Sequence, residues 1–334
     1  MKKNIFFGLL ISAVCIYFAF RGINFSDLGK SFASVNYFYI IPVVLIVLAS
    51  HWLRCYRWGK IMETLVCYDQ KTLFALGSIG FMAVGVLPAR LGEFARPYLV
   101  KKRSGIKMSA SMATIIVERV FDLLTLMLFM LIVIMRVTLP PEVERAGITM
   151  LSVSLTIFIV LIIMAVKRDS SINKIDSILR LLPQKIAAPL NRLAHSFIDG
   201  LQILPDIGKT LYVIFLSVVI WALLGLSAYV LFLGFGFDLS IFNGYAITVI
   251  IALGVMLPAA PGFIGTFHYA CKIGLVAFGV SIADAVSYAI LLHFFQMTPV
   301  VVLGLIMLPF QKISFPGIIQ HQDNDDANGS IEQC

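Results

Sequence analysis

Apolar runs long enough to cross a bilayer recur along this chain, and they constrain its fold more than any other feature. A helix needs about 20 apolar residues to cross the hydrocarbon core, so 334 residues leave room for roughly eight to ten such segments with their loops. Hydrophobic residues make up 60% of the chain and charged residues 13%, whereas soluble domains carry about 25% charged residues. The sequence therefore predicts an all-α polytopic membrane protein.

The basic residues lie mainly in loops beside the apolar runs. This distribution is typical of cytoplasmic loops, so the net charge of +8 does not point to a nucleic-acid partner. The first run follows Lys2 and Lys3 and has no small-residue cleavage site before Arg21, which favours an uncleaved first span. We expect both termini on the cytoplasmic side of a prokaryotic cytoplasmic (inner) membrane.

The second apolar run, residues 37–58, ends among three basic residues: Arg54, Arg57 and Lys60. Because positive charge marks cytoplasmic loops, this is predicted to be the cytoplasmic end of the span. Trp52 and Trp58 are predicted to anchor this end at the membrane interface.

The segment 72–100 is apolar at first and is then broken by Pro88 and Gly92. Both of its flanks are basic, which predicts a re-entrant hairpin that enters from the cytoplasm and returns to it. Three charged residues stand at the break: Arg90, Glu93 and Arg96. A charge at the bilayer centre costs at least about 2.5–3.5 kcal/mol, so we predict that the break lines a protein-walled cavity, as half of a substrate site. A shallow hairpin whose charges reach the headgroup level is the alternative.

The next apolar segment, residues 109–136, carries a stripe of polar residues at helical spacing. Glu118 and Asp122 lie one turn apart on one face, and Arg119 lies beside them. Ionisable residues within a membrane segment favour a functional role. A structural ion cluster that joins helices is the alternative.

The chain is predicted to consist of two membrane halves, residues 1–166 and residues 210–310. Between them, residues 167–209 predict two amphipathic helices on the cytoplasmic surface, which either connect the halves or recruit anionic lipid. Residues 311–334 are predicted to be a disordered tail. The second half contains a re-entrant hairpin at residues 241–279, with predicted breaks at Pro258, Pro261, Gly262 and Gly265.

The two hairpins share a pattern, GVLPARLGEF in the first and GVMLPAAPGF in the second. They are predicted to open from opposite sides of the membrane, which indicates an inverted-topology repeat. The segments that follow them align so that Arg119 pairs with His293 and Asp122 pairs with Gln296. In transporters, paired broken helices of this kind place the substrate site near the midplane.

The run LPARLGEFARPYL, followed by ATIIVERVFDLL, resembles the flippase-like membrane domain family associated with lysylphosphatidylglycerol synthases. The later LPAAPGFIGTFH resembles the family's second motif, Pro-Gly-Gly-x-Gly-x-x-Glu, with Phe263 at the second glycine and His268 at the glutamate. The resemblance covers about the whole chain. It implies a stand-alone member without the soluble synthase domain, which moves phospholipids or polyprenyl-phosphate lipids between leaflets and is not an enzyme.

A phosphate-bearing headgroup needs fixed cations in a shielded cavity. Arg90, Arg96 and Arg119 are predicted to supply them, because a planar guanidinium forms paired hydrogen bonds with phosphate. His268 and His293 are predicted to act as proton relays or as packing residues. The carboxylates are predicted to hold the arginines or to bind a cationic headgroup: Glu93, Glu118 and Asp122.

Two other functions stay open at this stage. An integral membrane enzyme acting on lipid would need a nucleophile or a metal set, and the sequence contains no His-Glu-x-x-His or Gly-x-Ser-x-Gly motif. An ion-coupled transporter of small solutes would also use charged broken helices. The expected partner is a membrane lipid, with no cofactor and no metal, and both a homo-oligomer and a separate lipid-synthesising enzyme stay open.

Overall fold

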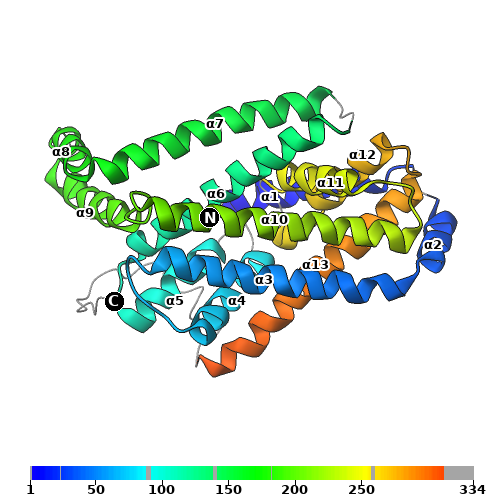
Figure 1. Ribbon diagram of the computed structural model, residues 1–334, viewed down its shortest axis with the longest axis horizontal. Helices are drawn as coiled ribbons and strands as arrows, with labels where there is room; N and C mark the ends of the chain where they lie inside the picture. Colours follow the sequence, from blue (N-terminus) through cyan, green and yellow to red (C-terminus); the bar gives the residue numbers. More distant parts are fainter. Residues whose placement is uncertain are drawn as a thin grey trace.

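The computed structural model describes residues 2–22, 24–87, 92–137, 141–181, 183–256 and 260–311. Three residues of the predicted breaks therefore lie outside the described residues: Pro88, Arg90 and Pro258. Within the described ranges the chain is helical and contains no strand (Figure 1). The elements in chain order are α1 (Lys2–Phe20), α2 (Phe25–Ser34), the short turn η1 (Tyr37–Tyr39), α3 (Ile40–Met62), α4 (Gln70–Val86), α5 (Ala95–Ser104), α6 (Met108–Ile134), α7 (Pro141–Val166), α8 (Arg168–Leu179), α9 (Gln184–Gly200), α10 (Ile207–Phe235), α11 (Ile241–Gly254), the short turn η3 (Pro261–Phe263), α12 (Thr266–Ala277) and α13 (Ile282–Phe310).

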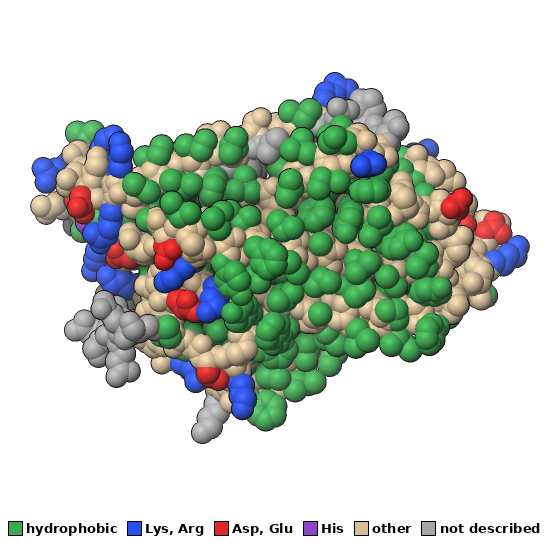
Figure 2. Space-filling view, viewed as in Figure 1, with side chains coloured by type: hydrophobic (Ala, Val, Ile, Leu, Met, Phe, Trp, Pro, Cys, Tyr) green, Lys and Arg blue, Asp and Glu red, His purple; other side chains and the backbone are tan. Residues whose placement is uncertain are grey.

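The long helices form one bundle in which α3, α7 and α10 run along the long axis of the molecule (Figure 1). Figure 2 shows hydrophobic side chains over the middle of the visible face, with charged side chains gathered mainly at its two ends. Such an apolar belt suits hydrocarbon, as expected of a membrane protein. Among the described residues, three helical segments are long and apolar enough to cross a membrane: Tyr37–Met62, Ile207–Phe235 and Ile282–Phe310.

The polar stripe predicted on residues 109–136 lies on α6 and faces the interior of the bundle. Glu118, Asp122 and Thr114 on this helix are all buried. The end of α3, however, departs from its prediction. Trp58 is fully buried rather than anchored at the interface, and its indole N–H donates to Thr114 Oγ1 at 3.3 Å. The reason is that side chains of α4, α5 and α6 pack around this end of α3.

The first break is held by a close approach of two backbone segments. α4 ends at Val86, and a helical turn at residues 92–94 leads into α5. A Cβ added to Gly92 would lie 2.1 Å from the backbone nitrogen of Val84. Only glycine fits this approach, so the returning chain lies directly against the end of α4.

The second break lies in and around η3, which Pro261 begins. Gly262 and Gly265 have φ angles of +67° and +98°, in the region that favours glycine. α1 packs onto this break, since Ser12 Oγ accepts a hydrogen bond from the backbone N–H of Ala260 at 2.6 Å. A Cβ on Gly265 would lie 2.5 Å from the Ser12 carbonyl oxygen, so glycine is required here as well.

The helix pairs at the two breaks have their outer ends at opposite ends of the molecule (Figure 1). α4 begins and α5 ends toward the end of the molecule that carries α8 and α9, whereas α11 begins toward the end that carries α2. The inner ends of the helices in each pair therefore point toward the middle of the bundle.

The α8–α9 pair caps one end of the bundle and is fixed by polar contacts. Asp176 accepts hydrogen bonds from Asn191 Nδ2 at 2.6 Å and from His195 Nε2 at 2.9 Å. The bond from His195 lowers the pKa of the Asp176 carboxyl below its ordinary value. Arg168 also pairs with Asp199 at 2.6 Å, and these contacts keep the two helices together.

Candidate functional site

A network of buried arginines and carboxylates lies inside the bundle, and Arg57 of α3 is at its centre. Arg57 Nη1 donates to Asp122 Oδ1 at 2.7 Å, and Nη2 donates to Glu118 Oε1 at 3.2 Å. Nη1 also donates to Ser217 Oγ of α10 at 2.6 Å. Arg57 and Glu118 are fully buried, so these bonds join α3, α6 and α10 away from water.

Two further arginines share the same carboxylates. Arg96 Nη1 of α5 donates to Glu118 Oε2 at 2.7 Å, and Arg119 Nη2 donates to Glu118 Oε1 at 2.9 Å. Arg119 Nη1 lies 3.5 Å from Asp122 Oδ2. Gly80 of α4 makes room for Arg96, because an added Cβ would lie 2.1 Å from the Arg96 Cγ. Three guanidinium groups therefore surround Glu118 and compensate the burial of its charge.

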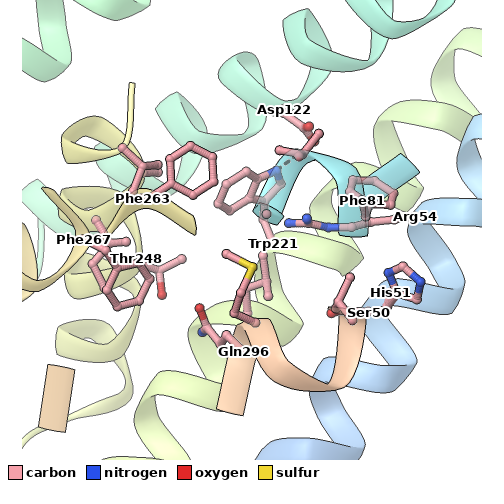
Figure 3. Close-up of a pocket in the computed structure, with 18 of the residues that line it drawn as sticks. Ser50, His51, Arg54, Phe81, Asp122, Trp221, Thr248, Phe263, Phe267 and Gln296 are labelled. Carbon is pink, nitrogen blue, oxygen red and sulfur yellow. Dashed lines mark hydrogen bonds between the residues drawn. The ribbon is translucent and has the colours of Figure 1, made fainter. Parts of the chain in front are cut away.

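A cavity of about 390 Å³ lies beside this network (Figure 3). Its charged wall comes from the first half of the chain and includes Glu93, Arg96, Arg119 and Asp122. Most of the remaining wall is apolar and comes from α10, α11, α13 and η3 with the start of α12. Ligand sites of about 300–1,000 Å³ typically combine a few polar groups with an apolar wall in this way.

Arg54 of α3 projects into the cavity beside two aromatic rings (Figure 3). Its guanidinium carbon lies 5.7 Å from the centroid of Phe81 and 5.9 Å from that of Trp221, within the range of cation–π attraction. Trp221 is itself fixed, because its indole N–H donates to Asp122 Oδ1 at 3.0 Å. Within the described part of the chain, Arg54 has no ion-pair or hydrogen-bond partner, in contrast to the arginines around Glu118. Its donors are therefore available to a ligand.

The charges of the network and the cavity wall do not cancel. The described residues contribute four arginines and three carboxylates, which leaves one positive charge in excess. A cation without a counter-charge is costly in a shielded site, so the arrangement favours an anion as its ligand. The seven residues are Arg54, Arg57, Arg96, Arg119, Glu93, Glu118 and Asp122.

The second half of the chain supplies the facing wall. His293 and Gln296 of α13 line the cavity together with Phe263. His293 Nε2 donates to the carbonyl oxygen of Gly262 at 2.7 Å, which ties α13 to the second break. Phe263 has a φ of +57°, a conformation that favours glycine, at a position where the resembled motif has glycine. The ring centroid of His268 lies 4.8 Å from that of His293.

The structure brings most of the predicted site residues together. Glu118 and His268 are not on the cavity wall: Glu118 lies behind it as a counter-charge, and His268 lies against His293. Arg90 is outside the described residues. The other predicted residues line the cavity, namely Glu93, Arg96, Arg119, Asp122 and His293.

Sequence reasoning missed the contribution of α3. The basic run of Arg54, Arg57 and Lys60 predicts a cytoplasmic membrane end, and neither arginine is among the predicted site residues. A signal was nevertheless present, since His51, Arg54 and Arg57 recur at a spacing that puts them on one helical face. The same rule identified the stripe on α6. Trp221 gave no comparable signal, because a lone tryptophan in an apolar helix is ordinary.

The sequence matches the family described as "Lysylphosphatidylglycerol synthase TM region" over residues 5–304. It is 27% identical over 322 residues to a UPF0104 membrane protein of Methanothermobacter thermautotrophicus, covering 92% of each chain. It is 26% identical over 222 residues to a UPF0104 membrane protein of Methanocaldococcus jannaschii, covering 66% of this chain and 91% of that protein. Glycosyltransferase AglD of Haloferax volcanii is 32% identical over 127 residues, covering 37% of this chain and 20% of that protein. No solved structure matches the chain.

The family match covers nearly the whole bundle. It begins within α1 and ends within α13, so it includes both breaks and the cavity between them. The chain therefore belongs to the lysylphosphatidylglycerol synthase transmembrane-region family.

Proposed function

We propose that the protein is a lipid flippase, which moves an anionic, phosphate-bearing lipid between leaflets and performs no catalysis. The observation that carries this proposal is Arg54. It faces the cavity beside Phe81 and Trp221 with no acidic partner among the described residues. A lipid phosphate would supply the missing negative charge, and guanidinium binds phosphate through paired hydrogen bonds. Phospholipids and polyprenyl-phosphate lipids both present this group.

The broken helices support movement across the membrane. We interpret the pairs α4–α5 and α11–α12 as re-entrant hairpins of an inverted-topology repeat, because their outer ends lie at opposite ends of the molecule (Figure 1). The residue pairs of the repeat, Arg119 with His293 and Asp122 with Gln296, all line the cavity. In transporters of this design the two halves rock around a site near the midplane. A headgroup held there would become accessible to each leaflet in turn.

We place the end that carries α8 and α9 in the cytoplasm, in a prokaryotic inner membrane, with both chain termini on that side. Lys and Arg side chains gather at this end (Figure 2), and positive charge favours the cytoplasmic side. Arg103 at the end of α5 donates to Gln311 Oε1 at 3.0 Å, which fixes the end of α13 to the same side.

A separate lipid-synthesising enzyme is the proposed partner. The family is named after a synthase. One relative is named as a glycosyltransferase, and the matched region makes up 20% of that protein. Both names associate this membrane region with an enzyme. This supports a division of labour in which an enzyme makes the lipid and this protein moves it.

Reconstitution in liposomes tests the proposal. The vesicles would contain a headgroup-labelled anionic phospholipid, a labelled polyprenyl phosphate, or a zwitterionic phospholipid with the same chains. Transbilayer movement is followed by the loss of label to a membrane-impermeant quencher. We expect faster movement of at least one anionic lipid than in protein-free vesicles, with little effect on the zwitterionic lipid. Rates equal to those of protein-free vesicles for all three lipids would contradict the proposal.

A lipid-modifying membrane enzyme and an ion-coupled solute transporter are the alternatives, and the same vesicles separate them. Mass spectrometry of the extracted lipids should show unchanged headgroups if the protein only moves lipid. A converted headgroup would favour the enzyme. Uptake of a small anionic solute under an ion gradient, without lipid movement, would favour the solute transporter.

A further inference from the structure

A second cavity, of about 480 Å³, lies where α8 and α9 meet α6 and α7. It takes no part in the arginine network, and Ser109 contributes the one polar side chain among the described residues that line it. Its wall is otherwise made of aliphatic, methionine and phenylalanine side chains, including Phe94, Met112, Met164, Leu179, Leu193 and Phe197.

The apolar wall of this cavity is suited to bind a hydrocarbon chain. Water is not expected to fill it, because an ordered water needs two to four polar partners. Apolar side chains of the helices around it are also exposed, since Ile178 is 64% and Leu193 is 54% accessible. On the surface of a membrane protein such exposed apolar groups face lipid.

Basic residues lie on the same helices as the residues that line the cavity, or next to them in the chain. Lys107 immediately precedes Met108, which lines the cavity. Lys174 and Arg192 lie on α8 and α9, which form one of its walls. Basic side chains at a membrane surface attract anionic headgroups. The surroundings therefore complement a lipid that combines an apolar chain with a negative charge.

One helical turn separates the two cavities. Glu93 lines the charged cavity, and its chain neighbour Phe94 lines the apolar one. Both belong to the turn at residues 92–94, which Gly92 holds against α4. Adjacent Cα atoms lie 3.8 Å apart, so the two cavities approach each other closely at this turn.

We infer that the apolar cavity holds the hydrocarbon chain of the transported lipid while its anionic headgroup occupies the cavity at Arg54. This inference rests on the proposed function and specifies its substrate as a lipid whose chain stays bound during headgroup transfer. The position of Glu93 and Phe94 makes their turn the divider between head and tail.

Site-directed photocrosslinking tests this inference without requiring transport. A photoreactive phenylalanine analogue replaces Met112 in the apolar cavity or, as a matched control, Ile159, which is 49% accessible on α7. The full-length protein is placed in vesicles of equal parts phosphatidylglycerol and phosphatidylcholine with identical acyl chains. Mass spectrometry then gives the ratio of the two lipids attached at each position.

We expect several-fold enrichment of phosphatidylglycerol at position 112 and the bulk ratio at position 159. Arg54→Gln should return position 112 to the bulk ratio, because the head and the tail belong to one molecule. A bulk ratio at position 112 in the wild-type background, or no attached lipid there, would overturn the inference. Enrichment that survives Arg54→Gln would show a lipid site independent of the charged cavity, which also contradicts it.

A cavity-filling variant supplies a second test and separates the two proposals. Met112→Trp should slow the movement of a long-chain anionic lipid several-fold and leave a short-chain analogue nearly unaffected, with Ile159→Trp as the control. Equal effects on both chain lengths would contradict the role of the apolar cavity. Enrichment at position 112 without any lipid movement in the wild type would remove the proposed flippase function but keep the lipid site.

Discussion

Glu118 and Arg54 show two ways in which a membrane protein keeps charge inside its bundle. The two carboxylate oxygens of Glu118 accept hydrogen bonds from Arg57, Arg96 and Arg119. Removing one partner of a buried ion network leaves uncompensated charge, which costs about 3–5 kcal/mol. Arg54 lies against aromatic rings and has no carboxylate partner among the described residues. Its charge is therefore available to bind a ligand and does not join helices.

This difference predicts that Glu118→Gln destabilises the protein. All three arginines would lose a charged acceptor, although Arg57 and Arg119 would keep Asp122, and the free energy of unfolding should fall by about 3 kcal/mol. The check is thermal or denaturant unfolding in detergent. Glu63→Gln is the matched control, because Glu63 pairs with Lys60 at 2.6 Å at a partly exposed site, where a pair contributes about 0–1 kcal/mol. Equal stability losses for the two variants would contradict a structural role for Glu118.

At the scale of elements, the breaks depend on glycines that let backbones touch. Gly92 lies against the backbone of α4, and Gly265 lies against the backbone of α1 at Ser12. In neither case is the obstacle a flexible side chain that could move aside. The conformation at each break is therefore fixed by backbone packing, which holds the residues of the cavity wall in place.

Gly92→Ala should disrupt the first break. The added Cβ meets the backbone nitrogen of Val84 at 2.1 Å, so the turn that carries Glu93 and Phe94 must shift. We expect a lower yield of folded protein and a lower melting temperature in detergent. Gly29→Ala is the control, because nothing lies within 4 Å of its added Cβ and alanine favours a helix by up to about 1 kcal/mol. A Gly92→Ala protein as stable as Gly29→Ala would contradict the packing of the break.

Sequence rules that depend on neighbouring residues predict the helices better than they predict what packs around each helix. The stripe on residues 109–136 corresponds to buried positions of α6 because helical spacing depends only on neighbours in the chain. The positive-inside rule and the aromatic belt did not predict the burial of Arg57 and Trp58, since these rules cannot register the helices that pack around the two residues. The aromatic neighbours of Arg54 could not be predicted from the sequence either. Phe81 and Trp221 come from distant segments that meet only in the folded bundle. The repeat alignment paired Arg119 with His293, and both residues line the same cavity, while the inverted repeat itself stays a prediction.

At the scale of the whole molecule, the apolar belt separates two unlike ends (Figure 2). One end carries the α8–α9 pair and many basic side chains, and the other carries α2 and the loop between α10 and α11. An inverted repeat needs the two broken helix pairs to open toward these different ends. The orientation of the ends is therefore part of the proposed mechanism.

Cysteine labelling in whole cells tests this orientation. A cysteine replacing Asp238, in the loop after α10, should react with a membrane-impermeant maleimide in intact cells. A cysteine replacing Lys174 on α8 should react only after the membrane is permeabilised. The unsubstituted chain is the control for the native cysteines, of which Cys15, Cys55 and Cys271 are buried. Labelling of both introduced cysteines from the same side would contradict the inverted arrangement.

The most direct test of the central claim is the rate of anionic lipid movement in proteoliposomes that contain Arg54→Gln or Arg136→Gln. Arg136 is the matched control, because it lies 5.4 Å from the centroid of Phe242 but is exposed at the end of α6 and outside the cavity. Hydrogen bonds to charged groups contribute about 1.5–3 kcal/mol, so Arg54→Gln should slow movement at low lipid concentration by about 10- to 100-fold, with an unchanged melting temperature. Arg136→Gln should match the wild type. Equal rates for the two variants would contradict the assignment of Arg54 as the anchor of the lipid headgroup.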